Sequence, residues 1–147
     1  MVRRLAISAT AAALTLTAVN AHALFIFGPK KFTVTCQLTN EHPGAGAIGK
    51  QLPVQQLSSA GAASLSGSID LISKNTVLVR GVRASIGVTL GNGGRYNAIV
   101  SFTKPTGQLI YKGSTILQLG AWSSVNWQDW PKSMGYLGAQ CLVQKAK

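Results

Sequence analysis

The 147-residue chain contains very few acidic residues, and this narrows the chemistry that it can perform. Only Glu41, Asp70 and Asp129 carry carboxylates, against 14 Lys and Arg residues. A glycosidase needs two facing carboxylates, and any pair here would have to come from distant segments. A protein-built metal site needs clustered Cys, His, Asp or Glu ligands, and the sequence contains no such cluster. We therefore expect a protein without a metal ion or other cofactor.

Histidine is equally scarce, and His42 is the single one after residue 23. A Ser-His-Asp hydrolase needs a base beside its nucleophile and a carboxylate that orients the base. His42 lies between Glu41 and Pro43, in a stretch with the composition of a solvated loop. No G-x-S-x-G, phosphate-binding glycine loop or H-E-x-x-H is present. A small hydrolase built on Glu41, His42 or a Ser/Lys pair is therefore the least favoured function, and we expect a non-catalytic protein.

Long apolar runs are confined to the N-terminus. Two arginines precede an uncharged run at 5–19, and the pattern at 21–23 is small-x-small, as signal peptidase requires. The run is shorter than the ~20 apolar residues that a membrane-spanning helix needs. The sequence thus predicts a cleaved signal peptide, 1–23, and one domain, 24–147, that is secreted, periplasmic or on the cell surface and has no membrane span.

Cysteine occurs twice, as Cys36 and Cys141, 105 positions apart. In an exported protein such a pair is most simply a disulfide. Both residues stand on the apolar side of an alternating segment, so we expect both to face the core. The bond would either pin the first strand to the last or tie two sheets together across the core.

Helical periodicity is absent, and period-two alternation of apolar and polar residues runs through most of the domain. Turn signals stand at 91–94 and 104–107, while a Gly/Ala/Ser-rich loop region covers about 40–63, with a short helical turn starting at Pro53. We predict a small antiparallel β-sandwich of about seven or eight strands, with a small β-barrel as the alternative. The expected strands are 32–38, 65–71, 82–90, 96–102, 108–112, 115–122 and 137–143.

Tryptophan is found only in the stretch AWSSVNWQDWP, 121–131. Trp122 ends a predicted apolar strand, so we expect its ring to pack in the core. Trp127 and Trp130 follow the polar pair Ser123-Ser124, and we expect both in a polar loop. Sugar-binding sites often set indole faces beside amides and carboxylates, and the candidate ligand-binding residues are Trp127, Trp130, Asn126, Gln128 and Asp129. Packing roles for Trp127 and Trp130 are favoured over ligand binding, because aromatic side chains dominate the burial of small cores.

Positive charge is the strongest functional signal. Removal of the signal peptide leaves 12 Lys and Arg residues and three carboxylates, a formal charge of about +9. Such a surface attracts polyanions, although lysines also keep domains soluble and protect strand edges from aggregation. Sequence-specific nucleic-acid binding is disfavoured, because no recognition helix or RNA-binding strand motif is present. The candidate polyanion-binding residues are Lys30, Lys31, Arg80, Arg83 and Arg95.

Two functions therefore lead. The first is a non-catalytic structural or interaction module of the cell envelope or surface, whose partner is another envelope or surface protein. Parts of a secretion, pilus or conjugation apparatus are among its expected roles. The second is a binding protein for anionic glycans or other envelope polymers, acting through the basic surface and exposed tryptophans.

Overall fold

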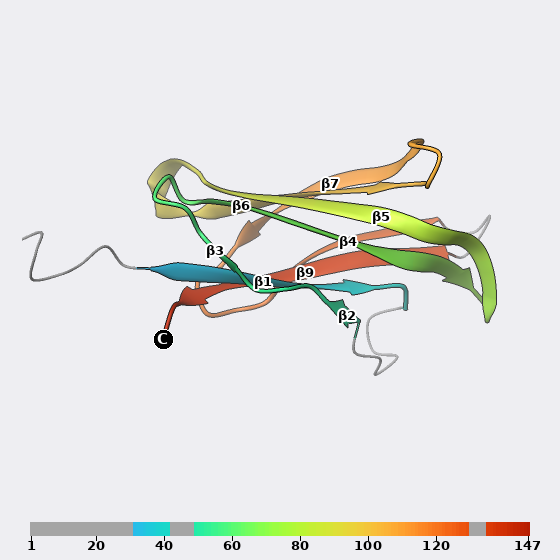
Figure 1. The fold of residues 1–147 in the computed structure, drawn as a ribbon, viewed down its shortest axis with the longest axis horizontal. Helices are drawn as coiled ribbons and strands as arrows, with labels where there is room; N and C mark the ends of the chain where they lie inside the picture. Colours follow the sequence, from blue (N-terminus) through green and yellow to red (C-terminus); the bar gives the residue numbers. More distant parts are fainter. Residues whose placement is uncertain (1–30, 42–48, 130–134) are drawn as a thin grey trace, which may run out of the picture.

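The computed structural model describes residues 31–41, 49–129 and 135–147. Within them the chain forms nine strands and one 3-10 turn (Figure 1). The strands are β1 (Phe32–Thr39), β2 (Lys50–Gln51), β3 (Gln55–Gln56), β4 (Ala62–Ser73), β5 (Thr76–Leu90), β6 (Tyr96–Thr103), β7 (Leu109–Leu117), β8 (Ser123–Asp129) and β9 (Gly135–Lys145), and the turn η1 is Asn92–Gly94. The predicted signal peptide, together with Lys30, His42 and Trp130, lies outside the described residues.

The strands form one antiparallel hydrogen-bonded sheet that folds into two layers lying face to face (Figure 1). One layer is the meander β4–β5–β6–β7, built from consecutive hairpins. In the other, β9 pairs with β1 on one side and with β8 on the other, and β2 and β3 pair with the outer edge of β1. The pairs Ile72–Tyr136 and Leu119–Val143 link the layers. The predicted sandwich is confirmed, and the sheet does not close into a barrel.

The period-two pattern of the sequence explains the core. Because successive side chains of a strand point to opposite faces, alternate residues of each long strand meet between the layers. In β5 the even-numbered positions from Val82 to Val88 are buried and the odd ones are exposed. The fully buried larger side chains of the core are Val34, Leu38, Val82, Ile86, Val88, Val100, Phe102, Leu137 and Val143.

The predicted disulfide is present between Cys36 and Cys141. The two residues are direct partners in the β1–β9 ladder, and their Cα atoms are 4.1 Å apart. The bond therefore pins the first long strand to the last within one layer, and the alternative of a bond between two sheets is wrong. Closing a loop of this length limits the unfolded chain, for which the chain-entropy model gives about 4–5 kcal/mol.

The structure corrects three local predictions. The segments 108–112 and 115–122 are one strand, β7, which ends at Leu117. Gly113 does not interrupt it, because this residue pairs with Val100, and its missing side chain leaves room for those of Tyr111 and Val125. The polar stretch after Trp122 is a strand, β8, since each of its residues pairs with one of β9.

The third correction concerns the loop region at 40–63. The helical turn expected from Pro53 is not formed, because Gln55 and Gln56 pair with β1 as the short strand β3. The same region contains β2 and the first residues of β4. Residues 42–48, the Gly/Ala-rich part of the predicted loop region, lie outside the described residues.

Candidate functional site

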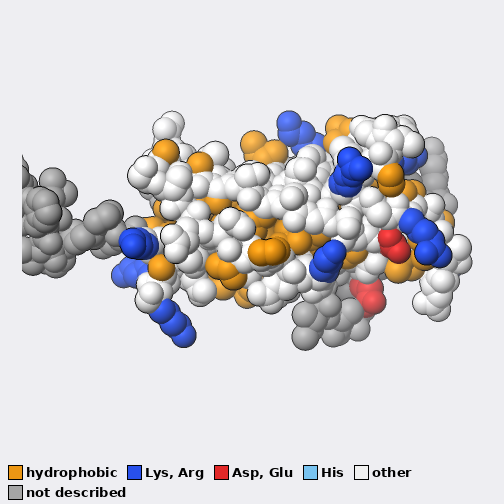
Figure 2. All heavy atoms as spheres, in the orientation of Figure 1, with side chains coloured by type: hydrophobic (Ala, Val, Ile, Leu, Met, Phe, Trp, Pro, Cys, Tyr) orange, Lys and Arg blue, Asp and Glu red, His pale blue; other side chains and the backbone are white. Residues whose placement is uncertain are grey.

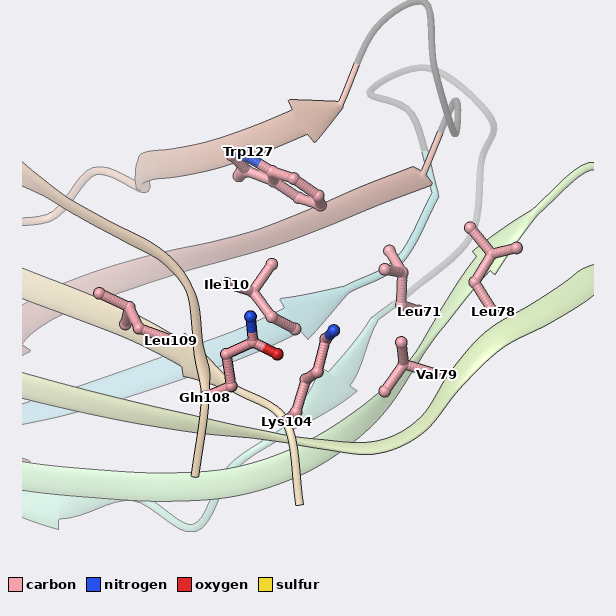
Figure 3. Close-up of a pocket in the computed structure, with 8 residues that line it drawn as sticks. All are labelled: Leu71, Leu78, Val79, Lys104, Gln108, Leu109, Ile110 and Trp127. Atoms are coloured by element: carbon pink, nitrogen blue, oxygen red, sulfur yellow. The ribbon is translucent and has the colours of Figure 1, made fainter. Parts of the chain in front are cut away.

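An apolar cleft opens at the end of the sandwich where the β4–β5 and β6–β7 turns lie (Figure 3). Its volume is about 340 Å³, near the lower end of the range of small-ligand sites. Both layers contribute, and in Figure 3 the Trp127 ring faces Ile110 across the opening. We call this feature the Trp127 cleft. It is lined by Leu71, Leu78, Val79, Lys104, Gln108, Leu109, Ile110 and Trp127.

Irregularities in the β4–β5 ladder shape one wall of the cleft. Arg80 and Gly81 together oppose Asp70, so the register slips at this point. Gly81 has φ of +64°, which glycine adopts without strain, and its N–H donates a hydrogen bond to Asp70 Oδ1 at 2.7 Å. A second slip follows before the turn, and Leu78 is left exposed at the rim. One of the three carboxylates thus stabilises the backbone of the cleft wall.

Trp127 forms the opposite wall. It lies in β8 opposite Leu137, is half-buried and packs against the core. Its ring centroid is 6.5 Å from that of Tyr111, with the planes inclined by 31°. The indole is therefore held by packing and also presents part of its surface to the cleft.

The structure does not bring the predicted sugar-binding residues together. Alternation along β8 turns Val125 and Trp127 inward, while Asn126 and Gln128 are exposed on the other face. Asp129 ends the strand, opposite Gly135. The indole of Trp127 therefore has Lys104 and Gln108 as polar neighbours in place of the residues next to it in sequence.

These two polar groups come from a tight turn. Gly107 N–H donates to Lys104 O, and Lys104 N–H donates to Gln108 O, each at 2.8 Å, as expected of the predicted turn. In Figure 3 both side chains project into the cleft beneath Trp127. An ammonium and an amide beside apolar walls suit an apolar group that carries a negative charge or a hydrogen-bond acceptor. Sequence reasoning missed this set, because its members come from four separate strands and a turn.

The prediction for Trp122 is wrong, since its side chain is 43% exposed. The strand that was expected to bury it ends at Leu117, and a turn at 118–122 follows. Gly120, with φ of +76°, donates from its N–H to Val143 O, and this turn carries Trp122 outside the core. The most exposed tryptophan that the structure describes is therefore the one that the sequence placed inside.

The candidate polyanion-binding residues do not form one patch. Lys31 and Arg95 are exposed at the end opposite the Trp127 cleft, while Arg80 is exposed next to the cleft residue Val79. Arg83 lies on the outer face of β5, between Ser68 and Thr103 of the neighbouring strands. The space-filling view also shows basic side chains at both ends (Figure 2).

Glu41 and Asp70 are the carboxylates whose side chains the structure describes. Glu41 is exposed just after β1, and Asp70 is bound to the backbone N–H of Gly81. Among residues 31–41, 49–129 and 135–147, no three His, Cys, Asp or Glu side chains are placed to share a metal ion. The same residues contain no helix that is long and apolar enough to cross a membrane.

Comparison of the chain with protein-family models, with curated protein sequences and with solved structures finds no match in any of the three.

Proposed function

We propose that the chain is a non-catalytic interaction module of the cell envelope or surface that holds an apolar side chain of a protein partner in the Trp127 cleft. We propose a secretion, pilus or conjugation apparatus as the assembly to which such a module belongs. The disulfide suits an oxidising compartment of this kind.

The observation that carries the proposal is the composition of the cleft. Six of its eight lining residues are apolar, and Leu78 and Leu109 are exposed at its rim. Protein interfaces concentrate their binding energy in aromatic and aliphatic anchors that fill such hollows. Lys104 and Gln108 add the few polar groups that fix the orientation of a bound segment.

Photo-crosslinking tests the proposal. Benzoylphenylalanine replaces Leu109 in the cleft, and in a control chain it replaces Ile99 on the outer face of β6. The two positions have similar exposure, 55% and 47%. After irradiation with an envelope fraction of the producing cells, we expect a protein adduct from position 109 and none from position 99.

A further substitution makes the test specific. Leu78→Asp, introduced together with the position-109 probe, is expected to lower the adduct yield several-fold, because the charge disrupts the apolar rim. Equal adducts from positions 99 and 109, or no protein adduct from 109, would contradict the proposal.

A further inference from the structure

The end of the sandwich opposite the Trp127 cleft combines positive charge with exposed apolar side chains. We call it the basic end. Four cations there are exposed: Lys31, Arg95, Lys145 and Lys147. The ladders bring them to one end, because Phe32 pairs with Lys145 and the N–H of Ala146 donates to Lys31 O.

Large apolar side chains stand among these cations. Leu90 is 48% exposed, Leu119 is 56% exposed, and Ile116 is similarly open. One shallow hollow joins Arg95 to Ile116 and Leu119, and a second joins Lys31 to Leu90. Tyr96 lines both hollows, so the two adjoin. Trp122 follows in the turn that begins just before Leu119, and its indole is 43% exposed.

Carboxylate side chains are absent from this end. The chain has only three, and the strand register places all of them toward the other end: Glu41 follows the end of β1, Asp70 opposes the bulge of β5, and Asp129 ends β8. Figure 2 agrees, since the acidic side chains in view lie at the end away from the C-terminus. The basic end therefore has no acidic side chain to offset its positive charge.

We propose that the basic end docks the protein on the surface of a lipid bilayer that contains anionic lipids. Each Lys or Arg near such a surface strengthens binding by roughly fivefold. Tryptophan favours the level of the lipid head groups, and leucine side chains enter the acyl boundary beneath them. Stable attachment to a membrane surface generally needs two signals, and this end supplies both charge and apolar contact.

A soluble anionic polysaccharide fits this surface less well. Such a polymer uses the cations, but it gives Leu90, Ile116 and Leu119 no apolar environment. The bilayer is the partner that accounts for both kinds of side chain. This inference is independent of the Trp127 cleft, which lies at the other end of the molecule.

Vesicle flotation with the disulfide-bonded protein tests the inference. The vesicles contain phosphatidylcholine alone, or phosphatidylcholine with about a quarter of phosphatidylglycerol as the anionic lipid. We expect binding to the anionic vesicles, at least tenfold weaker binding to the neutral ones, and quenching of tryptophan fluorescence by brominated lipid.

Two matched substitutions assign the binding to one end. Leu119→Ser and Leu109→Ser change equally exposed leucines, 56% and 55%, at opposite ends of the sandwich. We expect Leu119→Ser combined with Trp122→Ala to weaken vesicle binding at least tenfold, and Leu109→Ser to change it less than twofold. If the double variant does not fold, Lys145→Gln with Arg95→Gln replaces it, with a loss of roughly 25-fold expected.

Three outcomes would overturn the inference. The first is no binding to the anionic vesicles at low salt. The second is equal weakening by Leu109→Ser and by the basic-end variant. The third is undiminished vesicle binding by the variant that lacks Leu119 and Trp122, together with unchanged retention on heparin, which would identify a soluble polyanion as the partner. None of these outcomes bears on cross-linking from the cleft, so the two proposals fail separately.

Discussion

The two ends of this sandwich share one core but present different surfaces. At the cleft end, slips in the β4–β5 register and the turn at 104–107 surround an apolar hollow, and the carboxylates lie toward this end. At the basic end, leucine and isoleucine side chains near the ends of β5 and β7 and in the turn after β7 are exposed among cations. The buried alternate residues of the strands form the core between the two ends. The residues at the ends are therefore not needed for core packing, and their chemistry can differ. The contrast indicates that the turns, the bulges and the ends of the strands determine the surface chemistry of this fold, while the central parts of the strands form the core.

Removal of the disulfide has the largest expected effect, and it should weaken both ends together because Cys36 lies midway along β1. Cys36→Ala with Cys141→Ala is expected to lower the free energy of unfolding by about 4 kcal/mol, as the unfolded chain regains its freedom. Urea unfolding followed by circular dichroism measures this. A loss of structure at one end only, detected by hydrogen exchange, would contradict the shared-core account.

Replacement of the two described tryptophans compares the ends directly. Trp127→Ala is expected to lower the free energy of unfolding by about 2–3 kcal/mol, less than for a fully buried ring, because the indole is half-buried against the core. Trp122→Ala is expected to change it by less than about 0.5 kcal/mol, as for most exposed positions. Thermal unfolding of both variants provides the measurement, and equal losses would show that the two rings are equivalent.

Asp70 tests the irregular wall of the cleft. Asp70→Ala leaves the N–H of Gly81 without its carboxylate acceptor and is expected to lower the free energy of unfolding by about 1–2 kcal/mol. Asp70→Asn keeps an oxygen acceptor and should lose less than half as much. Hydrogen exchange at Gly81 should rise in the alanine variant, while exchange at Leu90, at the other end of β5, stays unchanged.

The smallest effect is a pH dependence at the cleft end. Burial raises the pKa of the Tyr136 phenol above its ordinary value of 10.0, because desolvation disfavours the phenolate. The folded state then holds the phenol proton more tightly than the unfolded state does. The contribution of Tyr136 to the free energy of unfolding is therefore fully present below pH ~10, and the free energy of unfolding falls as the pH rises above that value. Tyr136→Phe should reduce the difference between the unfolding free energies at pH ~9 and pH ~11. An identical difference in the variant would assign the alkaline loss to other groups.

Much of the fold could be predicted because apolar and polar residues alternate along each long strand, and this local pattern indicates which positions are buried. The inward positions of β5 and β6, and the inward direction of Cys36 and Cys141, follow from this pattern. The disulfide between them follows from their being the two cysteines of the chain. The pattern failed where polar residues form a strand. The apolar residues on the inner face of β8 are Val125 and Trp127, and pairing with β9 holds the strand in place.

The candidate sites could not be predicted, because they depend on contacts between distant segments. Trp122 follows an apolar stretch in sequence, but the strand stops at Leu117 and the following turn exposes the ring. Trp127 has polar neighbours in sequence, but strand alternation separates its side chain from them. Only the packing of the layers brings Trp127 to the same hollow as Lys104 and Leu71.

The bond between Cys36 and Cys141 also determines how the protein responds to mechanical force. A force that pulls β1 and β9 apart is carried by β1, the Sγ–Sγ bond and β9. The residues between Cys36 and Cys141 do not carry this force. Residues 37–140, which include both hairpin turns of the Trp127 cleft, therefore cannot be drawn out while the bond is intact. Under tension the domain behaves as a short, nearly inextensible link, and it becomes a long extensible one only after reduction.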